Sequence, residues 1–500
     1  MMGSATRDRN RYLRILLYAW IFLSVAGCGA FFSSTAAPAF DIKRQTFASL
    51  SAIKNAKKAE IVDHFTEMRE TARAIKDDTI MLRSFVALQQ GKSTANLEDV
   101  VNERYATIYG DFYDILFVDA SGYVFHSVKK ERDYHTALLA FPETENALAK
   151  ALKRPGDEQF VEFSYYQPSD EPAAFFTVSL QATGRHLGWF VLQISTNSTS
   201  QILADRATMG RTGEVYLVNQ ASLMLSDSRF MEDSTILRQK VDTAAVREAL
   251  RKNSGDSIIN DYRGVRVFSS YEKFDVLGVG WIIIAEIDED EVLTEFYKKH
   301  KTYFQSEFVR YLAAGPRAEA LPWDRQFPRQ RVDMNEFARA QEGKMLVTGG
   351  VASCTAVVIS YPGKFSYLAH ISPTDEIYQD GPVTKFILGR HSHNFLAALL
   401  NKIEFFDIYP AERRHLRVAI VAPHTESFAN AVDAVLARDF ELANISFLYD
   451  PAARSADVAV NASGDRLDVR WVEEERILTE DGLKTENLAE VLKRIIDYEA

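Results

Sequence analysis

The sequence lacks a second segment that could cross a membrane. Its one long apolar run lies near the N-terminus, at residues 15–26. A bilayer-spanning helix needs about 20 predominantly apolar residues, and no later stretch meets that requirement. Residues 296–313, for example, contain three lysines, one glutamate and one arginine. We therefore expect the chain after the apolar run to lie on one side of the membrane, outside the cytoplasm.

Cysteine is also scarce, because the chain has only Cys28 and Cys354. Cys28 ends the segment Val25-Ala-Gly-Cys, which follows the apolar run and four arginines between residues 7 and 14. This segment resembles a bacterial lipobox, in which Cys28 is lipidated and becomes the first mature residue. An uncleaved anchor helix within residues 1–28 is the alternative. In both cases we expect a protein anchored to the inner or outer membrane, on the periplasmic face of the bacterial cell envelope.

Positive charge is in deficit. The formal net charge is -11, which argues against nucleic acids and anionic membrane surfaces as partners. The sequence also has no glycine-rich phosphate loop and no zinc-type cluster of cysteine and histidine. His391 and His393 would point apart on a helix. We therefore expect no cofactor and no metal.

Residues 43–90 carry apolar side chains mostly three or four positions apart, with charged residues between them. This spacing predicts a long amphipathic stalk helix within residues 29–97, one face of which packs against another surface. Such a helix is also compatible with a homodimer formed through the stalk.

The period changes after residue 110, where apolar runs of strand length are separated by hairpin-type turns. The plan occurs twice, in residues 98–205 and 206–297, with interleaved helices. We therefore predict an α+β fold with two successive antiparallel sheets. The expected strands are residues 115–118, 123–128, 173–180 and 187–194, then 214–218, 223–225, 265–271 and 281–285.

These segments carry a family resemblance. Tyr113-Asp-Ile-Leu-Phe-Val-Asp-Ala-Ser-Gly-Tyr-Val-Phe-His-Ser-Val-Lys-Lys-Glu131, Gly210-Arg-Thr-Gly-Glu-Val-Tyr-Leu-Val218 and Gly280-Trp-Ile-Ile-Ile-Ala-Glu-Ile-Asp288 resemble the double Cache family of bacterial extracytoplasmic sensors. The resemblance implies two PAS-like units, a membrane-distal one at residues 98–205 and a membrane-proximal one at residues 206–297. It also implies that the distal unit binds a small ligand and that a second transmembrane helix relays the signal. That helix is missing from this sequence.

Aromatic and polar residues of the distal unit are candidates for a ligand pocket. Aromatic walls with a few polar groups suit a small polar metabolite, although each of these residues could instead belong to an ordinary core. The candidates are Tyr113, Lys129, Tyr134, Tyr165 and Phe175.

The C-terminal part reads as a separate domain. Residues 298–343 contain several prolines and arginines and are expected to form a linker, and residues 344–475 alternate strand and helix patterns. We predict a helix over residues 383–406 and a closing amphipathic helix within residues 476–500.

A cysteine–histidine pair is the candidate for chemistry in this domain. Cys354 ends Thr348-Gly-Gly-Val-Ala-Ser-Cys, and His370 ends the next apolar strand. Two antiparallel strands joined by the turn at residues 361–364 would bring the two side chains near each other. A cysteine beside a histidine is the minimum for a thiolate nucleophile. The structural alternative for Cys354 is a small buried hydrophobe.

This arrangement resembles the chemoreceptor glutamine deamidase family, CheD, which has an α/β sandwich-like fold. The resemblance implies that Cys354 is the nucleophile, His370 the base and Thr348 the residue that orients the histidine. The sequence departs from the family pattern at Ala352, where glycine is usual, and at Pro373, which comes about one residue early. The usual glycine-rich segment near the later strands is replaced by Ala422-Pro-His-Thr.

Two functions follow from these patterns. The first is a small-ligand sensor in signal transduction, related to chemotaxis, whose third domain docks onto a membrane receptor or signalling protein. The second is a ligand-controlled cysteine amidohydrolase similar to the glutamine deamidases.

Overall fold

The computed structural model describes residues 41–498, except residues 93–94, 141–146, 155, 157, 183, 205–208, 315–327, 373–376, 381–382, 387–389, 424–425, 439, 451–452, 473–476, 481–486 and 497. The predicted signal or anchor segment, with Cys28, lies outside these residues. Among the described residues, no helix combines the length and the hydropathy that a membrane span needs.

The predicted long N-terminal helix is confirmed as α2 (Ile42–Ala74), but it ends before residue 90 and a second helix completes the stalk. Helix α2 runs into the short 3-10 helix η1 (Ile75–Asp77), and α3 (Thr79–Gln89) follows. The break falls at Asp78, whose extended backbone and side-chain cap begin a new helix. Its Oδ1 accepts hydrogen bonds from the amides of Ile80 and Met81, at 3.0 and 3.3 Å.

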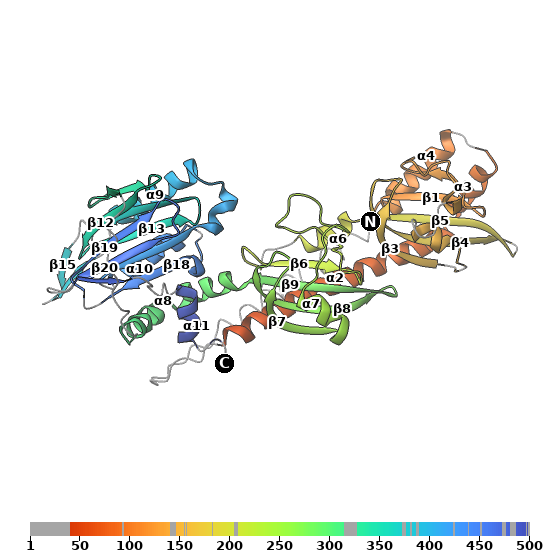
Figure 1. The fold of residues 1–500 in the computed structure, drawn as a ribbon. Helices are drawn as coiled ribbons and strands as arrows, with labels where there is room; N and C mark the ends of the chain where they lie inside the picture. Colours follow the sequence, from red (N-terminus) through yellow and green to blue (C-terminus); the bar gives the residue numbers. More distant parts are fainter. Residues whose placement is uncertain are drawn as a thin grey trace. The chain divides into compact units, whose positions relative to one another are not determined.

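The distal unit contains a five-stranded antiparallel sheet in the order β2-β1-β5-β4-β3 (Figure 1). One face packs on the stalk, where Phe85 of α3 contacts Phe117 and Phe190. The elements are α4 (Ala95–Arg104), π-helical η2 (Tyr105–Tyr109), β1 (Asp114–Asp119), β2 (Val124–Ser127), η3 (Leu138–Ala140), α5 (Ala147–Leu152), β3 (Glu158–Tyr166), β4 (Glu171–Ala182), β5 (Arg185–Ser195) and α6 (Asn197–Leu203).

The proximal unit contains a four-stranded antiparallel sheet in the order β6-β9-β8-β7. Phe65 of α2 packs edge-on against Trp281 of this sheet, with ring centroids 5.2 Å apart. Residues 223–225, which we predicted as a strand, form only isolated bridges. The elements are β6 (Glu214–Val218), α7 (Ala244–Lys252), β7 (Ser254–Asn260), β8 (Arg266–Val276) and β9 (Val279–Asp288).

The stretch expected as a linker contains regular structure. Helix α8 (Glu289–Ala314) follows β9 directly and leaves helical geometry at His300. Strand β10 (Arg329–Arg331) is an edge strand of one sheet of the C-terminal domain, and β11 (Glu336–Arg339) is an edge strand of the other. Strands this short are set by pairing with distant partners, such as β10 with β12, rather than by their own sequence.

The C-terminal domain has two five-stranded mixed sheets, ordered β10-β12-β19-β20-β21 and β11-β14-β13-β17-β18. Side chains of β13 point alternately to the two faces of its sheet. Ala356 and Val358 belong to a buried cluster with residues of β12 and β19 in the other sheet, and Val357 and Ile359 belong to the cluster that contains α9. The strands are β12 (Met345–Val351), β13 (Thr355–Tyr361), β14 (Phe365–Ile371), β17 (Arg417–Ala422), β18 (Ile445–Tyr449), β19 (Ser455–Asn461), β20 (Leu467–Val472) and β21 (Ile477–Glu480).

The helix predicted over residues 383–406 begins later than expected. Its first part is strand β16 (Val383–Phe386), which pairs with β15 (Ile377–Asp380). The remaining helical elements are α9 (Arg390–Phe406), η4 (Pro410–His415), α10 (Glu426–Leu436), η5 (Leu442–Asn444) and α11 (Leu488–Ile495).

Candidate functional sites

Polar residues gather at one end of the distal sheet, on the face turned away from the stalk. Asp114, the first residue of β1, is paired with Gln193 of β5. Side chains alternate along a strand, so Asp114 and Gln193 share the face of Leu116 and Val191, which lie in a buried cluster with Phe175. The polar residues therefore lie beside a buried apolar cluster on the same face of the sheet.

Asp114 anchors the loop of residues 128–137 to this end of the sheet. Its buried carboxylate accepts hydrogen bonds from the amides of Val128 and Lys129, at 2.9 and 3.0 Å, and from the Ser127 hydroxyl at 2.7 Å. Burial raises the pKa of Asp114, although these hydrogen bonds oppose the shift. The loop is thereby held where its acidic residues face the sheet.

Two acidic residues of this loop contact the strands. The Tyr113 hydroxyl donates to Glu131 Oε1 at 2.6 Å, and the Tyr166 hydroxyl donates to Asp133 Oδ2 at 2.8 Å. Ser169, in the turn between β3 and β4, donates to the other oxygen of Glu131 and accepts from Gln193 Nε2. Together with Asp114 and Glu171, the first residue of β4, these side chains form a polar group that we call the distal cluster.

Three acceptors of the distal cluster have no hydrogen-bond partner within the described part of the chain. They are Asp133 Oδ1, Glu171 Oε1 and Gln193 Oε1, and all three atoms are buried. Buried polar atoms are nearly always hydrogen-bonded. Burial, with Asp114 and Glu131 nearby, raises the pKa of Asp133 to about 6, and burial beside Glu131 raises the pKa of Glu171. The cluster is therefore suited to a group that carries N–H donors and positive charge.

The predicted ligand-binding residues have different surroundings. Tyr113 lies in the distal cluster, and the Lys129 ammonium lies 5.6 Å from its ring centroid. The Tyr134 ring contacts the neighbouring His135 ring at a tilt of 32°, Tyr165 is 53% exposed, and Phe175 is fully buried. Sequence reasoning missed Asp133, Glu171 and Gln193. A polar residue inside the apolar run 187–194 was the one local signal that could have indicated Gln193.

The proximal sheet has polar residues at the matching strand positions. Glu214, the first residue of β6, is paired with Glu286 of β9. Glu214 accepts from the Arg229 amide and from the Tyr262 hydroxyl, both at 2.7 Å. Glu286 accepts from the hydroxyls of Tyr216 at 2.9 Å and Ser269 at 2.7 Å. Burial raises the pKa of Glu286 to about 8.

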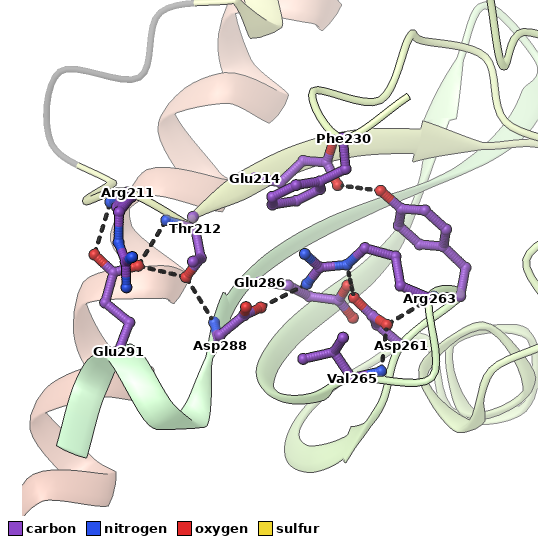
Figure 2. Close-up of polar contacts among 12 residues, drawn as sticks. Arg211, Thr212, Glu214, Phe230, Asp261, Arg263, Val265, Glu286, Asp288 and Glu291 are labelled. Atoms are coloured by element: carbon purple, nitrogen blue, oxygen red, sulfur yellow. Dashed lines mark hydrogen bonds and ion pairs between the residues drawn. The ribbon is translucent and has the colours of Figure 1, made fainter. Parts of the chain in front are cut away.

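Arg263 supplies the positive charge of this second group, which we call the proximal cluster. Figure 2 shows its guanidinium between Asp261 and Asp288, and each ion pair measures 2.5 Å. The guanidinium also lies 3.8 Å from the Phe230 ring centroid. Among the described residues, none of these side chains contributes a buried polar atom without a partner.

The family model for the Cache domain matches residues 40–296, slightly more than half of the chain. The chain belongs to the Cache domain family. The matched segment contains the stalk and both sheets, so the distal and proximal units are Cache units. No curated protein matches the chain.

Several solved Cache-type sensor domains are similar to this segment. The ligand-binding domain of the Pseudomonas fluorescens chemoreceptor CtaA, in complex with L-isoleucine, is 12% identical, with 51% of this chain and 95% of that chain covered and a TM-score of 0.34. The ligand-binding domain of the Pseudomonas aeruginosa amino acid chemoreceptor PctC, in complex with GABA, is 16% identical. The match covers 49% of this chain and 100% of that chain, with a TM-score of 0.33. The Vibrio cholerae histidine kinase DctB sensor domain is 10% identical. The match covers 49% of this chain and 98% of that chain, with a TM-score of 0.37. Superpositions this loose transfer no site geometry.

Thr348 and His370 meet in the C-terminal domain, outside the Cache match. The Thr348 hydroxyl lies 2.7 Å from His370 Nδ1 and 2.7 Å from the Val332 carbonyl oxygen. A carbonyl only accepts, so the hydroxyl donates to Val332 and Nδ1–H donates to Thr348. The Nε2 lone pair is then left available, and Nε2 is buried without a partner among the described residues. Burial lowers the pKa of His370 and so favours the neutral form of the ring.

Cys354 lies on the same sheet face as His370. Cys354 comes directly before β13. Ala356, two residues later, is paired with His370 of the neighbouring strand β14. Its Sγ contacts Met334 Sδ at 3.8 Å, and burial raises the pKa of the thiol. Pro373 lies outside the described residues. The turn at residues 361–364 does join two antiparallel strands, as the sequence indicated.

Proposed function

We propose that this protein is an extracytoplasmic sensor whose distal Cache unit binds a small organic cation. The observation that carries the proposal is the set of buried, unpartnered acceptors on Asp133, Glu171 and Gln193. A buried acceptor without a partner costs about 1–3 kcal/mol. A ligand that offers several N–H donors would remove that cost at three atoms at once.

Charge favours a cation over a neutral ligand. Glu131 lies close enough to help raise the pKa values of both Asp133 and Glu171. A bound positive charge would favour the ionised carboxylates and reverse that shift. Lys129, the nearby basic residue, faces the rings of Tyr105 and Tyr113 instead. We infer that the ligand carries an ammonium or guanidinium group.

A thermal-shift screen of the purified chain tests this proposal. The ligands would be primary amines, guanidines, amino acids, organic acids and neutral amides at matched ionic strength. We expect stabilisation by the cationic members, of about 2.7 kcal/mol at a hundredfold excess over Kd. Stabilisation by organic acids alone, or none in the whole set with a folded protein, would refute the cation proposal.

The compartment is tested separately from the ligand. A periplasm-dependent reporter fused after Ala500 should be active, because we expect no span after residue 28. A reporter that is active only in the cytoplasm would overturn the extracytoplasmic proposal and leave the ligand chemistry untouched.

A second candidate function is a cysteine amidohydrolase in the C-terminal domain. The Thr348–His370 hydrogen bond supports it, because it leaves Nε2 able to accept a proton. In the proposed step, the Cys354 thiol gives its proton to His370 and the thiolate attacks a side-chain amide carbonyl. Ammonia leaves with that proton, and water then hydrolyses the thioester to a carboxylate and the thiol.

Alkylation of Cys354 separates this reaction from a docking role. In an active site, iodoacetamide should react quickly at pH 7, slowly in His370→Ala, and more slowly in Thr348→Ala than in Thr348→Ser, which keeps the hydroxyl. A thiol that reacts only after unfolding, whichever residue is at 370, would exclude the hydrolase and leave a domain that docks onto a receptor or signalling protein.

A further inference from the structure

We propose that Arg263 is a built-in ligand of the proximal Cache unit, so that this unit contains a guanidinium-binding site that its own chain occupies. The two Cache units share a scaffold. In each, a carboxylate begins the first strand and is paired with a residue of the last strand: Asp114 with Gln193, and Glu214 with Glu286.

The loops that cover these positions are held in the same way. Asp114 accepts from the amide of Lys129, and Glu214 accepts from the amide of Arg229, in both cases 15 residues further along the chain. The two units therefore present the same sheet end and the same covering loop. They differ in what fills the space between these two surfaces.

A turn between the two strands that precede the last strand of each unit reaches that space. In the distal unit, the β3–β4 turn places Ser169 against Glu131 and Gln193. In the proximal unit, the β7–β8 turn places Arg263 between Asp261 and Asp288. A serine is too short to fill the space, whereas an arginine carries a planar fork that can contact two carboxylates.

The surroundings of Arg263 have the features of a ligand site. Its side chain is 13% exposed, two carboxylates hold its edges, and the Phe230 ring covers its face at 3.8 Å. The backbone amides of Arg263 and Val265 orient Asp261, at 2.7 and 3.0 Å. Paired carboxylates and an aromatic face are a recognition set for guanidinium.

Occupancy of this site fixes the start of helix α8. Asp288 is the last residue of β9, and α8 begins at the next residue. The Asp288 amide donates to Thr212 Oγ1 at 3.2 Å, and Glu291 of α8 accepts from the Arg211 and Thr212 amides (Figure 2). By holding Asp288, Arg263 keeps the proximal unit and the α8 start in one arrangement, so ligand response is left to the distal unit.

Chemical rescue tests the proposal in the full chain. Arg263→Ala should lower the melting temperature by about 5–15 °C, the scale of a broken buried ion pair in a domain of this size. Ethylguanidinium at about 10 mM should recover at least half of that loss in a saturable manner, compared with sodium chloride at the same concentration. Arg247→Ala, which removes an exposed arginine paired with Asp242, is the matched control and should show no rescue.

A second variant keeps the test decisive if Arg263→Ala does not fold. Asp288→Asn retains the arginine but removes one of its two carboxylates, and it should lose stability that ethylguanidinium does not restore. Rescue of Arg263→Ala no greater than that of Arg247→Ala, or a melting temperature unchanged in both Arg263→Ala and Asp288→Asn, would overturn the proposal. These readouts need no distal ligand, so they hold or fail independently of the proposed sensor function, although the comparison with the distal unit rests on it.

Discussion

The distal and proximal Cache units differ less in scaffold than in how their buried charge is balanced. The distal cluster has four carboxyl groups, and it has three buried acceptors without partners among the described residues. In the proximal cluster, the guanidinium of Arg263 pairs with Asp261 and Asp288. Under the two proposals above, one architecture serves as a receptor in the distal unit and as a structural support in the proximal unit, and the side chain of a single turn decides which.

The largest effect should come from closing the distal unit in the manner of the proximal one. Ser169→Arg would place a guanidinium beside Glu131 and Gln193, which Ser169 already contacts. We expect ligand affinity to fall about 100-fold, because a tethered group competes at high effective concentration. Calorimetric titration measures this. Ser121→Arg, at an exposed turn of the same unit, should bind normally, and equal losses in both variants would contradict the comparison.

Asp133 should have the next largest effect. A hydrogen bond to a charged group contributes about 1.5–3 kcal/mol, so Asp133→Asn should weaken a cationic ligand about 10- to 100-fold. The pKa of Asp133 is about 6, and a cation binds the ionised carboxylate. Affinity should therefore rise between pH 5 and 7 and level off above. A titration series over pH 5–8 should show this slope in the wild type and a flatter one in Asp133→Asn.

Local sequence patterns were sufficient for the hairpins and for the family. The turn after Asp119 and the strand of residues 187–194 lie within single continuous segments, where alternation and turn residues act together. The helix break at Asp78 was not predicted, because the apolar spacing continues on both sides of it. Strands β10 and β16 were not predicted, because an alternating pattern is not recognisable in three or four residues. Their pairing with other strands decides their conformation.

The distal cluster was only partly predictable for the same reason. Tyr113 and Lys129 lie beside the first hairpin and could be named from the sequence. Asp133 and Glu171 are far apart in the chain, and only the folding of the loop onto the sheet brings both of them near Glu131. A charged residue in a loop is otherwise typical of a solvated surface, so nothing local distinguishes it.

Glu286 offers a smaller, pH-dependent contrast, because Gln193 occupies the matching position in the distal unit. Burial raises the pKa of Glu286 to about 8, above its ordinary value of about 4.5. The native state therefore holds a proton that the unfolded state loses, and stability falls as pH rises from about 4.5 through 8. Glu286→Gln should lack this loss.

Melting curves measure that contrast. Glu286→Gln should match the wild type near pH 5 and exceed it by several degrees above pH 8. Gln193→Leu, which keeps the distal position neutral, should leave the pH dependence of the wild type unchanged. Parallel curves for the wild type and Glu286→Gln over the whole range would show that Glu286 is ionised in the native state.

Lys129 should give the smallest effect, and the most informative about the ligand. Its ammonium lies over the Tyr113 ring, whose hydroxyl holds Glu131, so it adds positive charge near a site that we propose for a cation. Partly screened repulsion of this kind amounts to a fraction of a kcal/mol up to about 1 kcal/mol. Lys129→Met should therefore bind a simple amine about threefold more tightly. Tighter binding confined to ligands without a carboxylate would support a plain cation. A tenfold loss would mean that Lys129 pairs with an anionic group, and the ligand would then be a zwitterion.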